Sequence, residues 1–108
     1  MYFYDPLDRQ GKELVAGVTA RTFWGDRMLV SIVDLEPRAV IPSHSHPHEQ
    51  IGVVLAGEYT ITIGEETRQV GEGDVYIIPG GVSHEVVTGA IRATAFEVFS
   101  PVREEYKF

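Results

Sequence analysis

The chain has 108 residues, the length of one domain, and can bury roughly two thirds of its unfolded surface around a single core. Its apolar content of 44% and charged content of 23% are typical of soluble globular proteins. The net charge of −7 disfavours binding to nucleic acid or to an anionic membrane surface, because both require a basic face. The absence of cysteine excludes disulfides and thiolate ligands, so nitrogen and oxygen must hold any metal.

The first ten residues, "MYFYDPLDRQ", have neither the basic start nor the apolar stretch of a signal peptide. No apolar run in the chain approaches the roughly 18 residues of a membrane span. We therefore expect a cytoplasmic protein. Three aromatic residues among the first four leave two alternatives for the N-terminal arm, residues 1–13. Their rings cover an edge of the core, or the arm packs on a second subunit of a homodimer.

Short runs rich in β-branched residues alternate with turn signals along the whole chain, and no segment shows the period of a long amphipathic helix. The clearest run, "EYTITI", places Tyr59, Ile61 and Ile63 on one face of a strand. Gly57 and Gly73 stand where turns with positive φ are expected. Many short strands at even spacing predict an all-β sandwich or barrel. The expected strands cover residues 14–23, 28–35, 51–56, 58–63, 75–78, 85–87 and 91–99.

Three of the four histidines fall within "PSHSHPHEQ", residues 42–50. Side chains at i and i+2 of a strand point to the same face, so His44 and His46 should project together. His48 shares their parity, but Pro47 should end or bend the strand. We therefore expect His48 and Glu49 at a rim or turn.

The spacing around these histidines resembles the paired motifs of the cupin family. In the first motif, Gln50 lies four residues after His46 and Gly57 seven residues after Gln50. The second motif is "GDVYIIPGGVSH", residues 73–84, which ends on the fourth histidine, His84. The resemblance implies a single-domain cupin double-stranded β-helix, a jelly-roll barrel, with its core at about residues 28–99 and a C-terminal tail at 100–108.

In cupins these motifs bind one metal ion, and the resemblance implies that His44, His46, Gln50 and His84 hold it here. The metal is a divalent transition ion, nickel, zinc, iron or manganese, because imidazole binds all of them. At position 50 the family more often has glutamate. Three neutral imidazoles and a neutral Gln50 leave the ion its full charge, which favours a Lewis acid that polarises ligand oxygens.

The C-terminal segment "FEVFSPVREEYKF" alternates Phe96 and Val98 with Glu97 and Phe99, so one of these pairs faces the barrel interior. A glutamate in such a strand is costly to bury unless it is paired or catalytic. With "HSHPHEQ", this tail resembles the KdgF family of pectin-degradation cupins, although that family more often has aspartate at the position of Glu97.

This narrower resemblance implies a metal-dependent enzyme that converts a cyclic 4,5-unsaturated uronate, or a related sugar acid, to its linear keto form. It assigns proton transfer to Glu97, an apolar wall to Phe99, and the clamp on the carboxylate of an anionic sugar to Arg103. Other arginines could serve as this clamp: Arg21, Arg27 and Arg92. Two alternatives to the enzyme remain, an iron-dependent cupin dioxygenase and a non-catalytic sugar-binding module.

Overall fold

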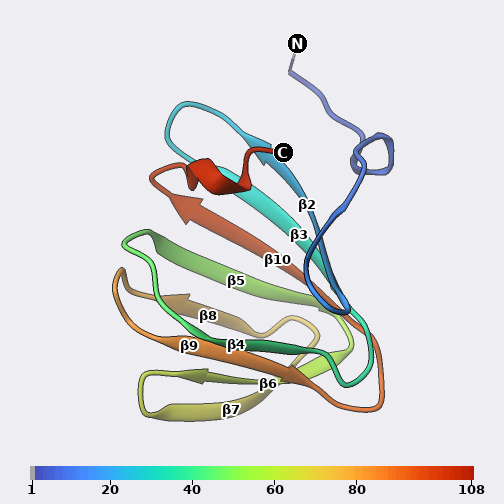
Figure 1. The fold of residues 1–108 in the computed structure, drawn as a ribbon, viewed down its shortest axis with the longest axis vertical. Coiled ribbons are helices and arrows are strands. Elements are labelled where there is room, and N and C mark those ends of the chain that lie inside the picture. Colours follow the sequence, from blue (N-terminus) through green and yellow to red (C-terminus); the bar gives the residue numbers. More distant parts are fainter. Residues whose placement is uncertain (1) are drawn as a thin grey trace.

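Two antiparallel sheets face each other in the computed structural model, which describes residues 2–108 (Figure 1). The larger sheet contains, in spatial order, β1 (Lys12–Val15), β2 (Val18–Trp24), β3 (Leu29–Leu35), β10 (Ala93–Ser100), β5 (Glu49–Ala56) and β8 (Val75–Ile78). The smaller sheet contains β4 (Val40–His44), β9 (His84–Thr88), β6 (Glu58–Ile63) and β7 (Glu66–Gly71). The predicted all-β jelly-roll barrel is confirmed.

Most predicted strands are present, with three differences. Strand β4 was not among the expected strands, and it ends at His44, so that His46 lies beyond it. The run at residues 14–23 is two strands, because Gly17 adopts a φ of 79° and turns the chain between β1 and β2. Strand β7 was not predicted, since it lies at the edge of its sheet and most of its side chains are exposed and polar. The expected positive φ angles are confirmed at Gly57 (72°) and Gly73 (88°).

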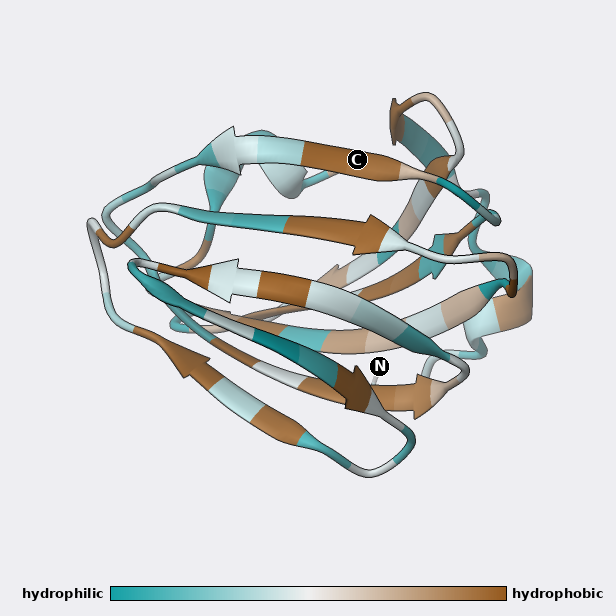
Figure 2. Ribbon diagram, turned by 90° about the horizontal axis from the view of Figure 1, so that it is seen from below, coloured by the Kyte–Doolittle hydropathy of each residue, from teal (hydrophilic) through white to brown (hydrophobic). Residues whose placement is uncertain are grey.

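The core lies between the sheets and is built from alternate residues of nearly every strand. In β6, Tyr59 and Ile61 are buried as the alternation predicts, and in β10 the buried residues include Glu97 and Phe99. Figure 2 shows the resulting alternation of apolar and polar segments along the strands. The sequence left open which face of β10 points inward, and the structure places Glu97 and Phe99 there.

The C-terminal tail folds back over one end of the barrel. Val102 and Tyr106 pack against Leu29 and Phe99, and Tyr106 lies in the short 3-10 helix η2 (Glu104–Tyr106). The hydroxyl of Thr22 donates a 2.5 Å hydrogen bond to the carbonyl oxygen of Tyr106. The tail therefore belongs to the wall of the barrel interior.

Residues 2–11 of the N-terminal arm lie outside both sheets and contain the 3-10 helix η1 (Pro6–Asp8), whereas its last two residues belong to β1 (Figure 1). Tyr2, Phe3 and Leu7 are 94%, 88% and 84% exposed, while Tyr4 packs against Phe23 with ring centroids 5.9 Å apart. Strand pairing begins at Lys12, ahead of the predicted barrel core. No helix in residues 2–108 has the length and apolar character needed to cross a membrane.

Candidate metal centre

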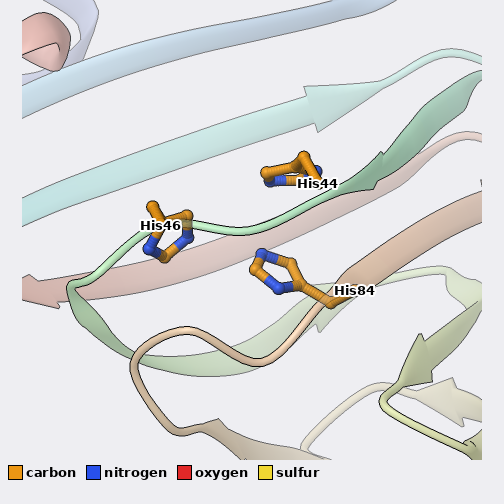
Figure 3. Close-up of side chains that lie close together, drawn as sticks. All are labelled: His44, His46 and His84. Atoms are coloured by element: carbon orange, nitrogen blue, oxygen red, sulfur yellow. The ribbon is translucent and has the colours of Figure 1, made fainter.

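Three histidines meet at the open edge between the sheets. His44 at the end of β4 is the register partner of His84 at the start of β9, and their ring centroids are 4.3 Å apart. His46 follows two residues after His44. One nitrogen of each ring lies within 4.8 Å of the others, an arrangement that can hold a metal ion. Figure 3 shows the three rings turned toward a common space.

Backbone carbonyls determine which nitrogen each ring presents to this space. Nδ1 of His44 contacts the carbonyl oxygen of Pro42 at 2.8 Å, and Nδ1 of His84 contacts that of Val82 at 2.9 Å. Nδ1 of His46 contacts the carbonyl oxygen of His48 at 3.1 Å. A carbonyl can only accept, so each Nδ1 carries the proton and each Nε2 keeps its lone pair. Hydrogen bonds of this kind, from the ring nitrogen that faces away from the ion, orient metal-binding imidazoles.

Burial also keeps the rings in the state that binds a metal. It lowers the pKa of His46 to about 4, with a further contribution from the positive charge of Arg103. Burial likewise lowers the pKa of His84. Both imidazoles are therefore neutral at pH 7, and only a neutral imidazole coordinates a metal.

Gln50 of β5 lies beside the three histidines. Its Oε1 lies 3.0 Å from Nε2 of His46. When Nδ1 of His46 carries the proton, Nε2 of His46 and Oε1 of Gln50 are both acceptors and cannot hydrogen-bond to each other. A cation that contacts both atoms would explain why they lie so close together. Nε2 of His84 is buried and has no hydrogen-bond partner within residues 2–108, so it too is free to bind an ion.

The loop before β9 is tied to the histidine segment. The backbone N–H of Gly81 donates to the carbonyl oxygen of His46 at 2.8 Å. Gly80 packs so closely on Pro47 that a Cβ atom there would clash with the Pro47 carbonyl oxygen. His48 is outside the group of three donors and contributes its backbone carbonyl instead. Glu49 is exposed.

Glu97 lies directly behind Gln50. Its Oε2 accepts a 3.0 Å hydrogen bond from Nε2 of Gln50, and its Oε1 accepts one from the hydroxyl of Tyr76. The carboxylate thus orients the amide so that the amide oxygen faces the histidines. Burial raises the pKa of Glu97 to about 7, although the hydrogen bonds from Tyr76 and Gln50 act in the opposite direction. The site therefore includes a carboxylate, which contacts the amide group of Gln50.

A glycine makes this contact possible. Gly52 of β5 is the register partner of both Glu97 and Tyr76, which lie on the two neighbouring strands. A Cβ atom on Gly52 would clash with the Tyr76 ring and with Oε2 of Glu97. The missing side chain lets Tyr76 reach across the central strand to the carboxylate.

A cavity of about 350 Å³ in the barrel interior leads to these groups. Its wall is mostly apolar, and its polar side chains include His44, His84, Gln50 and Glu97. Such a wall with a few convergent polar groups is typical of a small-molecule site.

Phe99 and Arg103 also line the cavity. The Phe99 ring packs edge-on against His46, with centroids 5.6 Å apart. Arg103 extends over the Tyr106 ring at 3.9 Å, and its Nε donates to Glu105 at 2.7 Å.

Arg21, Arg27 and Arg92 do not line this cavity. Arg21 and Arg92 both pair with Asp34, at 3.4 and 3.3 Å. The carbonyl oxygen of Arg27 accepts from the Ser100 hydroxyl. Arg103 is the one arginine among the residues that line the cavity.

Three neighbours of Glu97 were missed by the sequence analysis: Tyr76, Tyr59, whose hydroxyl lies 2.6 Å from that of Tyr76, and Gly52. The alternation of β6 and β8 predicts that both tyrosines face inward, where a buried hydroxyl requires a partner. A glycine inside the apolar run of β5 is likewise a signal of close approach.

Comparisons with known proteins agree with this geometry. A protein-family model described as "Cupin domain" matches residues 31–99. The pectin degradation protein KdgF of Dickeya dadantii (strain 3937) is 29% identical over 107 residues, which cover 97% of this chain and 96% of that protein.

Two solved structures share the fold. An RmlC-like cupin from Shewanella frigidimarina NCIMB 400 has a TM-score of 0.92 at 20% identity and covers 98% of this chain and 96% of its own. KdgF from a Halomonas species has a TM-score of 0.90 at 22% identity, with 97% of each chain covered. At these identities the two structures establish the shared fold.

Proposed function

The chain belongs to the cupin family, and we propose that it is a metal-dependent enzyme that converts a cyclic 4,5-unsaturated uronate, or a related sugar acid, to its linear keto form. The observation that carries this proposal is the junction of the histidine cluster with a buried carboxylate, through Gln50, in one cavity. The similarity to pectin degradation protein KdgF over nearly the whole chain supports a substrate that comes from the breakdown of pectin.

His44, His46, His84 and Gln50 would hold the ion, which we expect to be nickel, zinc, iron or manganese. When bound, such an ion supplies a Lewis acid that polarises substrate oxygens. The role of the four side chains is to fix the donor atoms. Each imidazole is oriented by a backbone carbonyl, and the amide of Gln50 is oriented by Glu97.

The reaction is an isomerisation that moves one proton from oxygen to carbon. The anomeric hydroxyl loses its proton as the bond between the anomeric carbon and the ring oxygen breaks. The ring oxygen keeps the electron pair of the broken bond and becomes the oxygen of an enolate. The enolate becomes a ketone when the neighbouring alkene carbon, the one that does not carry this oxygen, gains the proton. A single carboxyl group can accept the first proton and return one in the second step, provided that its pKa lies near the working pH. Burial raises the pKa of Glu97 from its ordinary value toward this range.

Phe99 and Arg103 would position the substrate. Phe99 is almost completely buried and presents an apolar wall beside His46. The guanidinium of Arg103 uses Nε for Glu105, so its terminal nitrogens would form the fork that binds a carboxylate. This local positive charge would offset the net charge of −7 for an anionic ligand. We also propose that the protein is cytoplasmic and forms a homodimer.

Substitution of Glu97 by glutamine tests the proposal. Glu97→Gln preserves size and polarity but removes the proton acceptor, so the loss of ultraviolet absorbance of the unsaturated uronate should slow by roughly 10²–10⁴-fold. The metal content should stay the same. Glu58→Gln, the same change at an exposed position in the smaller sheet, is the control and should leave the rate unchanged.

Two results would contradict the proposal. Full activity of Glu97→Gln would assign proton transfer to another group. A wild-type protein that does not accelerate uronate loss above the spontaneous rate would remove the uronate reaction altogether. Oxygen uptake by the iron-loaded protein would then indicate a dioxygenase, and sugar binding without turnover a binding module.

A further inference from the structure

A polar row crosses the inner face of the larger sheet. The strand registers align Thr22, Ser31, Glu97, Gly52 and Tyr76 on the five neighbouring strands β2, β3, β10, β5 and β8. The inward residues on either side of this row in β3 are Leu29 and Val33, which are buried and apolar. In β3 the row is therefore a polar position between two apolar ones.

One polar group of the row, the hydroxyl of Ser31, has no hydrogen-bond partner among residues 2–108. Thr22 donates to the Tyr106 carbonyl oxygen, and Tyr76 donates to Glu97. Both oxygens of Glu97 are directed toward Gln50 and Tyr76, on the side away from β3. Ser31 is 0% exposed, and its Oγ has no hydrogen-bond partner within residues 2–108.

An unpaired buried hydroxyl is rare and calls for an explanation. Packing alone does not explain Ser31, because alanine would fill nearly the same space and would bury no polar atom. Ser31 lines the cavity that also contains Glu97 and Arg103. Its hydroxyl is thus available to a molecule in the cavity, on the opposite side of Glu97 from Gln50.

The surrounding charges indicate what kind of group Ser31 would bind. Its register neighbours are the neutral Thr22 and the carboxyl group of Glu97, which would repel an anionic group. The arginine that lines the cavity, Arg103, is available to the anionic end of the ligand. A neutral hydroxyl, which can both donate and accept, suits Ser31.

We propose that Ser31 is a substrate-binding residue that recognises a hydroxyl group of the sugar acid and so favours polyhydroxylated ligands. This inference rests on the proposed function. Ser31 would hold its hydroxyl partner equally in the bound substrate and in the transition state. Its loss should therefore raise KM and leave kcat nearly unchanged, unlike the loss of the proton acceptor Glu97.

Calorimetry with D-galacturonate, a saturated uronate, and nickel-loaded protein tests the proposal without turnover. Ser31→Ala should weaken binding about tenfold, the effect of one lost hydrogen bond. Its free energy of unfolding and its nickel content should not fall, because the substitution breaks no hydrogen bond within the protein. Ser100→Ala makes the same chemical change at an exposed hydroxyl outside the cavity and should bind like the wild type.

The outcomes separate this proposal from the one on which it rests. Equal affinity of wild type and Ser31→Ala would overturn the role of Ser31 and leave the uronate function intact. A lower free energy of unfolding with unchanged affinity would assign Ser31 a purely structural role. Wild-type protein that binds no galacturonate and does not accelerate uronate loss would overturn both proposals.

Discussion

At the scale of single residues, the donor set depends on short contacts between histidine rings and nearby carbonyl groups. Each Nδ1 lies within hydrogen-bond distance of a carbonyl oxygen two residues away in the sequence. The residues that turn the chain beside each histidine therefore also orient its ring. This explains how His48, which is not among the clustered donors, still contributes to the site through its backbone.

His84→Ala removes the only donor of this set that comes from β9. We expect most of the metal to be lost while the barrel remains folded, because the side chain is not part of the apolar core. Nickel at about one hundred times its Kd should stabilise the wild type by about 2.7 kcal/mol. Thermal unfolding with and without nickel should thus show a shift of roughly 10 °C in the wild type.

His48→Ala is the matched control, since it removes a ring and keeps the carbonyl that orients His46. It should retain the metal and the thermal shift, as measured by elemental analysis and by circular dichroism. If His48→Ala lost the metal and His84→Ala retained it, His48 and not His84 would be the metal-binding residue.

At the scale of elements, the site depends on strand β5 having no side chain at one position. Gly52 lies between β10 and β8, and the contact of Tyr76 with Glu97 passes over it. The same carboxylate orients Gln50, which is two residues before Gly52 in β5. The geometry of the donor set is therefore linked to the packing of three adjacent strands.

Gly52→Ala should lower the free energy of unfolding by about 1–3 kcal/mol, because the added methyl group must displace Tyr76 or Glu97. Urea denaturation measures this change. Gly25→Ala is the control, since a Cβ atom there would meet nothing within 4 Å, and its effect should stay within about 0.5 kcal/mol. Equal stability of the two variants would mean that the three strands do not pack as closely as described.

At the scale of the whole molecule, the exposed arm is the feature that a single chain does not account for. Tyr2, Phe3 and Leu7 are almost fully exposed, and Figure 1 shows the arm projecting from the barrel. Tyr4 packs on Phe23, which alternates with the buried residues of β2 and so lies on the outer face of the sheet, away from the core. Exposed apolar residues that lie together mark interaction sites, so contact with a second subunit remains our prediction for the others.

Light scattering in solution should give a mass twice that of one chain. The combined substitutions Tyr2→Ser, Phe3→Ser and Leu7→Ser should halve it while each chain stays folded by circular dichroism, because these side chains are exposed and bury little surface within their own chain. A wild-type mass of one chain at every concentration would rule out the homodimer.

The sequence by itself determined the strands whose inner and outer faces differ in polarity, and the histidine segment. Side chains alternate with a period of two, so "EYTITI" shows its faces without reference to the rest of the chain. The motif spacing identified the histidine segment, although β4 ends at His44 and His46 lies beyond it. The same logic fails for β7, whose exposed residues carry no alternation, and for the turn at Gly17, inside a continuous apolar run.

Only the tertiary structure decided which faces meet. Period-two alternation placed Glu97 and Phe99 on one face of β10 but did not say which face was inside. The contacts of Glu97 with Gln50 and Tyr76 join residues 47 and 21 positions apart. Ser31 lies beside Glu97 in the cavity wall because β3 pairs with β10, more than sixty residues later in the chain. Local sequence sets the direction of each side chain along its own strand, whereas pairing between distant strands sets its neighbours, and the chemistry of the site depends on those neighbours.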